Sequence, residues 1–306
     1  MAEQNSGGKA YLALAVGVTG SSFVGFFTRF SGVSSMTLCS LRMITTMVLF
    51  TVWIAVSGGW KQLRGIRPKQ LALCGLAGFI FAVHLVSSFE AVRSTSMAAA
   101  NVLLCTEVIF VALIGLVLGN RLNGRRWCYI LLAFAGSVLV GVGGSRGGSG
   151  PAPVYGCIIA LVGSLLSAIY TLLGQRLRKG GLSTIAYTYV LYGSTMVSII
   201  VLCLLRGEPV ASASLREWGP ALGMAVCGAF LGHSMYSYCL KFLHPAHVSA
   251  GKLMVPVLSG LAAIPIFGEI PTPLTLAGCV LVLLAVLAYT LLEARTSRQE
   301  EKNHAN

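Results

Sequence analysis

The sequence predicts an all-α membrane protein in which ten transmembrane helices form two inverted-topology five-helix repeats around a central cavity. Composition is the first reason, because 56% of the 306 residues are hydrophobic and only 10% are charged. A soluble chain of this length needs far more charge on its exterior. The second reason is that the apolar residues form continuous runs of about 20 residues, the length at which a helix crosses a bilayer. The third is an internal repeat that relates the two halves of the chain.

Ten apolar runs follow one another along the chain, and their continuity favours helices over the alternating pattern of a membrane barrel. They cover residues 10–28, 35–56, 70–89, 95–118, 126–143, 154–173, 182–205, 219–240, 246–267 and 273–292. Polar tails flank them at 1–9 and 293–306, and a flexible Gly/Ser/Pro-rich linker separates the fifth run from the sixth at 144–153. The chain is therefore divided into a first repeat, 10–143, and a second repeat, 154–292.

The internal repeat is clearest in the third and eighth runs, where FAVHLVSS at 81–88 corresponds to FLGHSMYS at 230–237. An offset of 149 residues places His84 on His233. Each repeat holds an odd number of helices, so the second copy must enter the membrane from the opposite face. This predicts a pseudo-twofold axis in the membrane plane, a plan found in secondary transporters, with a substrate site near the midplane.

The net charge of +13 is explained by membrane topology. Of the 22 Lys and Arg residues, 15 lie in the two tails and the even-numbered loops, whereas five lie in the odd-numbered loops. Because positive charge marks cytoplasmic segments, we expect a multi-pass protein of the plasma membrane (the bacterial inner membrane) with both termini in the cytoplasm. This distribution argues against a nucleic-acid partner. The expected partners are the lipid bilayer and a small-molecule substrate, with a monomer favoured over a dimer.

Several segments resemble the EamA repeat of the drug/metabolite transporter superfamily. In the second half these are LVGSLLSAIYTLLGQRL at 161–177 and HPAHVSAGKLMVPVLSGLAAIPIFGEIPTPLTLAG at 244–278. In the first half TGSSFVG at 19–25, Arg42 and STSMAAANVLL at 94–104 follow in the same order. The resemblance covers nearly the whole chain. It implies a ten-helix bundle with a cavity lined mainly by the first, third, fourth, sixth, eighth and ninth helices, and a structural role for Arg42 near the outer side.

The chain departs from the family pattern at positions that the resemblance places around the cavity. The family often has Trp where this chain has Thr19 and Ser167, Pro where it has Glu107, and Gly-Glu where it has Gly119-Asn120. A cavity that loses two indole rings and gains a carboxylate is wider and more polar. These departures argue against a purely aromatic or lipophilic substrate.

Ionisable side chains inside the runs are the main site candidates, because each costs about 3 kcal/mol to insert and usually faces a cavity or a partner. Glu107, in the fourth run, is interpreted as a proton-accepting or cation-binding carboxylate. The alternative is a structural ion pair with Lys252 or Arg42. Lys252 itself is either a counter-charge for a substrate carboxylate or a side chain that extends to the cytoplasmic surface.

His84 and His233 are interpreted as hydrogen-bonding groups for the substrate that also take part in proton coupling, since an imidazole titrates at about pH 6.5. The alternative is an interhelical hydrogen bond that holds the bundle together. The neighbouring Ser88 and Ser237 favour the first interpretation. Both imidazoles are expected to face one hydrated cavity.

The full set of predicted substrate-binding residues combines these groups with the nearby hydroxyls. It is His84, His233, Glu107, Lys252, Tyr236, Ser88, Ser237, Thr19, Ser167 and Tyr170. Pro256 and Pro265 interrupt the ninth run and are predicted to kink it as a gate. No metal or cofactor is predicted, because no ligand spacing such as HxxxH occurs and the nine cysteines form no CxxC pair.

These observations predict a secondary active transporter of a small polar or zwitterionic metabolite, working by alternating access. Export of an amino acid or a derivative in exchange for protons is the leading interpretation. An uncoupled facilitator or exchanger for an organic cation or a nucleotide-sugar is the alternative within transport. A membrane scaffold or binding protein is the alternative from another class, and an enzyme is not expected because no catalytic motif stands in a suitable context.

Overall fold

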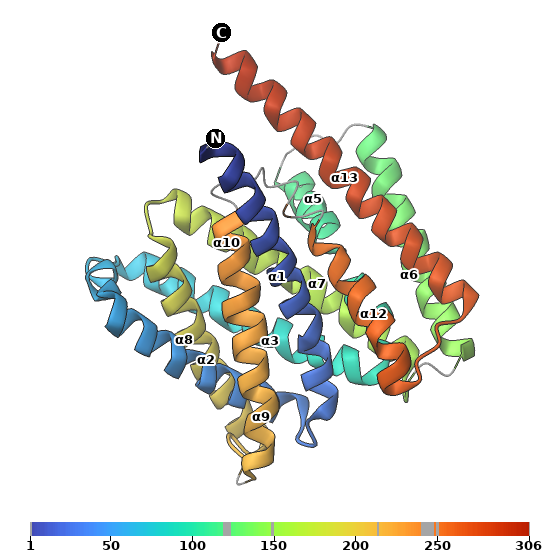
Figure 1. Ribbon diagram of the computed structural model, residues 1–306, viewed down its shortest axis with the longest axis horizontal. Helices are drawn as coiled ribbons and strands as arrows, with labels where there is room; N and C mark the ends of the chain where they lie inside the picture. The colour runs from blue at the N-terminus through green and yellow to red at the C-terminus, as the bar shows by residue number, and fades with distance from the viewer. Residues whose placement is uncertain are drawn as a thin grey trace.

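The computed structural model describes residues 2–118, 124–147, 150–212, 214–239, 248 and 251–305, and regular structure within these ranges is entirely helical. Figure 1 shows the helices packed as one bundle, with α6 and α13 side by side at one edge. The predicted all-α fold is confirmed.

Every predicted span contains helix. In the first half the elements are α1 (Ala2–Phe30), α2 (Ser35–Ser57), the 3₁₀ helix η1 (Gly59–Leu63), α3 (Pro68–Ser94), α4 (Met97–Leu104), α5 (Glu107–Val117) and α6 (Gly124–Gly147). In the second half they are α7 (Pro153–Lys179), α8 (Thr184–Arg206), α9 (Leu215–Met224), the π-helix η2 (Ala225–Ser234), α10 (Met235–Cys239), α12 (Met254–Phe267) and α13 (Pro273–Ala305). Within the described ranges, eight continuous helices are long and apolar enough to cross a membrane. The eighth and ninth of the ten predicted runs are not among them. The eighth run is divided among α9, η2 and α10, and the ninth contains the shorter α12.

Helix boundaries follow local capping chemistry. The hydroxyls of Ser34, Ser96 and Ser183 accept the backbone N–H three residues on and so start α2, α4 and α8. Gly207 and Gly268 end α8 and α12 in the left-handed conformation, with φ of 66° and 68°. Several helices also extend beyond the predicted runs, because an apolar pattern marks only the membrane-crossing part of a helix. Thus α1 and α13 enter the tails, and α6 covers the first part of the predicted linker.

The packing of the helices reflects the internal repeat. Helix α3 packs on α7. In the other repeat η2 and α10 correspond to α3, α1 corresponds to α7, and these helices pack on each other in the same way. The remaining equivalent pairs contact each other directly, α2 with α8, α4 with α12, and α6 with α13. Hydrogen bonds repeat as well, since Thr171 on α7 donates to Glu107 on α5 and Ser22, at the equivalent place on α1, donates to the carbonyl of Val255 on α12. This is the pattern of two copies related by a pseudo-twofold axis.

Both termini lie at the same end of the bundle in Figure 1, as an even number of spans requires. The opposite end carries the connections α1–α2, α3–α4, α8–α9 and α12–α13.

The fourth span is broken, which the continuous apolar run did not predict. Helix α4 ends at Leu104 and α5 begins at Glu107. The Thr106 hydroxyl donates to the carbonyl of Leu103 at 2.7 Å, and the Ser164 hydroxyl of α7 donates to that of Leu104 at 3.2 Å. These bonds matter because water is absent from a bilayer core and backbone polar groups must be satisfied by protein.

The ninth span has its break at the equivalent place. Helix α12 starts just after Leu253, its N-cap, and the repeat offset of 149 places Leu104 on Leu253. Each repeat therefore contributes one half-helix that begins inside the membrane, the arrangement that discontinuous transporter helices use at their binding sites.

The contact between α6 and α13 generates a stability prediction. A Cβ added at Gly136 of α6 would lie 2.8 Å from a methyl of Val282 and 3.0 Å from the carbonyl oxygen of Gly278, whereas one added at Gly141 meets nothing within 4 Å. Gly136→Val should therefore lower the free energy of unfolding by about 1–3 kcal/mol through overpacking. Gly141→Val, on the same helix, is the control for the loss of glycine. Thermal unfolding in detergent measures both, and equal melting temperatures would contradict this packing.

Candidate functional site

The Glu107 carboxylate lies at the break in the fourth span, in the first turn of α5. Its two oxygens accept hydrogen bonds from the hydroxyls of Ser167 at 2.7 Å and Thr171 at 2.8 Å. Ser167 and Thr171 are one turn apart on α7 and so present their hydroxyls on one face. The N-terminal end of α5 adds a favourable dipole for a negative charge. The carboxylate is thus held in a fixed position inside the membrane span.

His84 of α3 approaches the same face of α7. Its Nδ1 lies 2.7 Å from the carbonyl oxygen of Gly163, and because a carbonyl only accepts, Nδ1 carries the proton of the neutral ring. The other ring nitrogen, Nε2, takes no part in the hydrogen bond to Gly163. The imidazole is half-buried and lies 5.8 Å, centroid to centroid, from Tyr170, which in turn lies 4.6 Å from Phe81.

Four predicted residues therefore meet in one place. We call His84, Glu107, Ser167, Tyr170 and Thr171 the Glu107 cluster. Thr171 was missed by the sequence analysis, although its spacing from Ser167 and Tyr170 places it on the same helix face. Within the described residues no ion pair joins Glu107 to Lys252 or Arg42, so the structural ion pair weighed from the sequence does not form here.

Tyr236 and Lys252 contact each other near the place where α10 packs on α1. The Tyr236 hydroxyl donates to that of Ser21 at 3.1 Å. The Lys252 ammonium lies 4.6 Å from the centre of the Tyr236 ring, a cation–π distance, and the Lys252 residue is exposed. Tyr236 therefore links the first, eighth and ninth spans.

The remaining predicted residues are less informative. The side chains of His233 and Ser237 lie outside the described part of the chain, so the approach of the two imidazoles stays a prediction. Ser88 donates to the carbonyl of His84, one turn earlier in its own helix, at 2.7 Å. Thr19 is exposed on α1.

The two prolines occupy different places in the ninth span. Pro256 is buried in the first turn of α12, where a missing N–H removes no intrahelical bond. Pro265 is exposed and lies inside the helix. Pro256 thus marks the start of a half-helix, and a gating role for either residue stays a prediction.

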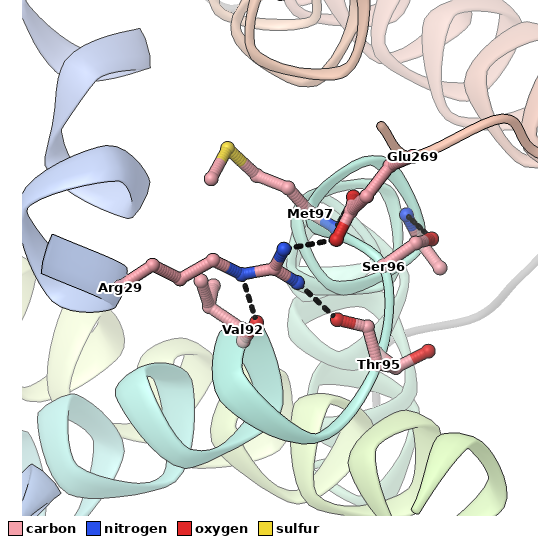
Figure 2. A network of polar contacts seen from close by, with 7 residues as sticks. Arg29, Val92, Thr95, Ser96, Met97 and Glu269 are labelled. Atoms are coloured by element: carbon pink, nitrogen blue, oxygen red, sulfur yellow. Dashed lines mark hydrogen bonds and ion pairs between the residues drawn. The ribbon is translucent and has the colours of Figure 1, made fainter. Parts of the chain in front are cut away.

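At the end opposite the termini, Arg29 ties three segments together, as Figure 2 shows. From α1 its guanidinium donates to the carbonyl of Val92 at 2.8 Å and that of Thr95 at 2.6 Å, and forms an ion pair with Glu269 between α12 and α13. Glu269 also accepts the backbone N–H of Met97 at 2.9 Å. We call these five residues the Arg29 clasp. Its two charged side chains are only 15% and 16% exposed.

Comparison with known proteins decides the family. The sequence model of the EamA-like transporter family matches residues 8–142 and again residues 154–291. The chain belongs to the EamA-like transporter family. It is therefore a membrane transporter, as its composition and repeat predicted.

Relatives of this EamA-like transporter span most of its length. An uncharacterized transporter of Archaeoglobus fulgidus is 24% identical over 94% of this chain and 98% of its own. A pseudopaline exporter of Pseudomonas aeruginosa is 27% identical over 69% of this chain and 72% of its own. A solved crystal structure superimposes with a TM-score of 0.60 at 20% identity, covering 94% of this chain and 98% of that chain, and shows that the fold is shared.

The EamA-like transporter also has a surface pocket beside the Arg29 clasp. It is lined in part by Arg29, Arg93, Phe267 and Glu269. The Arg29 guanidinium lies 5.1 Å from the centre of the Phe267 ring. The sequence analysis did not predict this arrangement, because its members come from helix ends and a connection that are far apart in the chain. Within the described residues no group of three or more His, Cys, Asp or Glu side chains is placed to hold a metal.

The Arg29 clasp generates a second prediction. Arg29→Lys keeps the charge but replaces a planar, forked donor with a single ammonium group, which cannot reach two carbonyls and a carboxylate in the same geometry. The free energy of unfolding of the transporter should fall by about 2 kcal/mol. Arg206→Lys is the matched control, since Arg206 is exposed in the last turn of α8 at the same end. If thermal unfolding gave both variants the wild-type melting temperature, the clasp would not contribute to stability.

Proposed function

We propose that the protein is a secondary active transporter that moves a small zwitterionic metabolite, an amino acid or a derivative, out of the cell by alternating access in exchange for protons. The observation that carries this proposal is the Glu107 carboxylate, fixed by two hydroxyls of α7 at a helix break inside the membrane, on the helix that the His84 imidazole also contacts. Ionisable groups at this depth are kept for transport and proton relay far more often than for stability.

Alternating access is supported by the symmetry of the breaks. One half-helix of each repeat begins within two residues of the same repeat position, and α4 contacts α12 through Asn101, whose amide donates to the hydroxyl of Ser259 at 2.9 Å. Rocking of one repeat against the other changes contacts along this seam while the site stays in place.

The direction of transport rests on two further points. The positive-inside distribution supports termini in the cytoplasm, and in that orientation the Arg29 clasp would lie at the outer end and hold it closed in this conformation. One relative is named an exporter of pseudopaline. An exporter must bind its substrate from the cytoplasm while its outer end is closed. A conformation with a closed outer end is therefore the one it needs before each transport step.

Proton coupling would use the neighbouring Glu107 and His84. The His84 Nδ1 is committed to the Gly163 carbonyl, which leaves Nε2 as the nitrogen that can take up a proton. Protonation of either group changes the charge of the site and therefore its affinity for a charged substrate.

An uncoupled facilitator for an organic cation is the second candidate, and a specific observation favours it. A fixed carboxylate next to Tyr170 and Phe81 offers both an opposite charge and aromatic faces, a combination that binds ammonium groups. The two candidates differ in whether flux responds to a pH gradient.

Flux in proteoliposomes tests the proposal. With radiolabelled amino acids inside the vesicles, efflux from wild-type protein should rise when a pH gradient supplies protons from outside. Glu107→Gln should lower that efflux about tenfold or more, since a charge-assisted contact contributes 1.5–3 kcal/mol. His84→Ala should remove the response to the gradient.

The matched control is Glu208→Gln, at a carboxylate that bonds Ser34 in the loops opposite the termini. Efflux that is unchanged in both Glu107→Gln and His84→Ala would contradict this site. Flux that ignores the gradient in wild-type protein would favour the facilitator.

A further inference from the structure

Arg42 is a buried charge that meets no acceptor among the residues the structure describes. It lies in α2, 8% exposed, within a span where a guanidinium is costly to insert. Its Nε is fully buried and without a hydrogen-bond partner. Within the part of the chain that the structure describes, no hydrogen bond or ion pair of Arg42 occurs, and the guanidinium only faces the Phe89 ring at 5.5 Å.

Arg93 shows what a structural arginine looks like in this protein. Its guanidinium donates to the carbonyl oxygens of Thr28, Ser31 and Val33 at 2.6–3.2 Å. Arg29 likewise engages two carbonyls and a carboxylate. The structural role implied for Arg42 by family resemblance therefore lacks the contacts that give Arg29 and Arg93 such a role.

A second unpartnered donor lies one turn from Arg42. Thr46 is 1% exposed, and its hydroxyl has no hydrogen-bond partner. The adjacent Thr45 shows the usual alternative, since its hydroxyl donates to the Leu41 carbonyl of the preceding turn at 2.8 Å. Residues four apart share a helix face, so Arg42 and Thr46 present two unsatisfied buried donors on one face, and buried donors are rarely left unsatisfied in native proteins.

The segment opposite this face packs closely on the guanidinium. Gly228 of η2 has no side chain, and a Cβ there would lie only 3.1 Å from the Arg42 Nη2. η2 is π-helical, and π-helical turns inside α-helices occur frequently at functional sites. A side chain at position 228 would therefore crowd the Arg42 guanidinium.

Arg42 faces the same apolar cluster that Tyr170 packs against. Phe89, under the guanidinium, belongs to this cluster together with Phe81, and the Tyr170 ring lies 4.6 Å from that of Phe81. Tyr170 is also a member of the Glu107 cluster, where its ring lies beside His84. One apolar cluster therefore contacts both the Arg42 guanidinium and the Glu107 cluster.

We propose that Arg42 and Thr46 form the subsite for the carboxylate of the substrate, while the Glu107 cluster receives its ammonium group. A guanidinium presents a planar fork that matches a carboxylate in bidentate geometry, and the Thr46 hydroxyl adds a third donor. The substrate class is then an α-amino acid or a related amino-carboxylate, with both charges recognised. This inference rests on the proposed function, because it assigns the two ends of the same transported molecule.

The first test needs no substrate. An unpaired buried charge destabilises its protein, so Arg42→Met should raise the melting temperature of the purified transporter or leave it unchanged. Arg93→Met is the matched control and should lower the melting temperature by several degrees, because it removes four hydrogen bonds to carbonyls. A fall for Arg42→Met as large as that for Arg93→Met would show a structural role and overturn the proposal.

The second test measures recognition of the carboxylate. Proteoliposomes are loaded with each proteinogenic L-amino acid, its carboxamide, or its decarboxylated amine, all radiolabelled, and efflux is compared. Wild-type protein should prefer the acid over the amide by about tenfold or more, as expected for a charge-assisted pair. Arg42→Met should abolish this preference, and Arg42→Lys should restore part of it.

A further variant tests the space beside Arg42. Gly228→Ala places a methyl group against the guanidinium and should lower efflux of the amino acid about tenfold, the loss expected when one charge-assisted contact is blocked. Efflux of the matching amine should change less, because the amine does not occupy this subsite. Equal losses for acid and amine would overturn the assignment.

The outcomes separate this inference from the proposed function. Wild-type protein that moves amino acids, their amides and their amines equally well is a transporter without this carboxylate subsite. An Arg42→Met variant that keeps the wild-type preference also overturns the inference alone. Wild-type protein that moves no member of the panel overturns the proposed function, and the inference falls with it.

Discussion

The structure depends on how backbone polar groups are satisfied where the fourth span breaks inside the membrane. The hydrocarbon core of a bilayer has no water to donate hydrogen bonds to the carbonyls that a broken helix exposes. Donors of the protein must take that role. The Leu103 carbonyl accepts both the N–H and the hydroxyl of Thr106, and the Leu104 carbonyl accepts the hydroxyl of Ser164. Because the break is stabilised in this way, α5 can begin at Glu107, and its carboxylate lies at a helix N-terminus rather than along a helix wall. A continuous helix would give the carboxylate neither the dipole nor this position.

The two repeats share the geometry of the break but not its chemistry. Each has a half-helix that begins within two residues of the same repeat position, and a hydroxyl of the sixth or first span donates to the first turn of each half-helix. Glu107 in one repeat corresponds to Pro256 in the other. The scaffold is therefore nearly symmetric, whereas the residues at the break are not, and only one of the two breaks carries a carboxylate.

Much of the fold followed from the sequence, because apolar runs of membrane-spanning length have few alternative structures. The offset that pairs His84 with His233 also predicted an inverted repeat, and the helix packing reflects it. The helix breaks could not be predicted, since a hydroxyl from another helix satisfies the backbone there and the run itself stays apolar. Thr171 was missed for a similar reason, as its partner Glu107 comes from a distant helix. The Arg29 clasp joins helix ends and connections whose sequences give no sign of contact.

The buried arginines differ in whether the protein supplies acceptors for their guanidinium groups. Arg29 and Arg93 lie where loops expose carbonyl oxygens, and both are fully engaged. Arg42 lies where helical carbonyls are already bonded within their own helices, so the protein offers it little. Under the proposed assignment, an empty site holds a positive and a negative group apart in a medium of low dielectric constant, which disfavours closure around it. A zwitterion satisfies both groups while adding no net charge, so its binding lowers the cost of closing both ends and makes the change of access depend on the substrate.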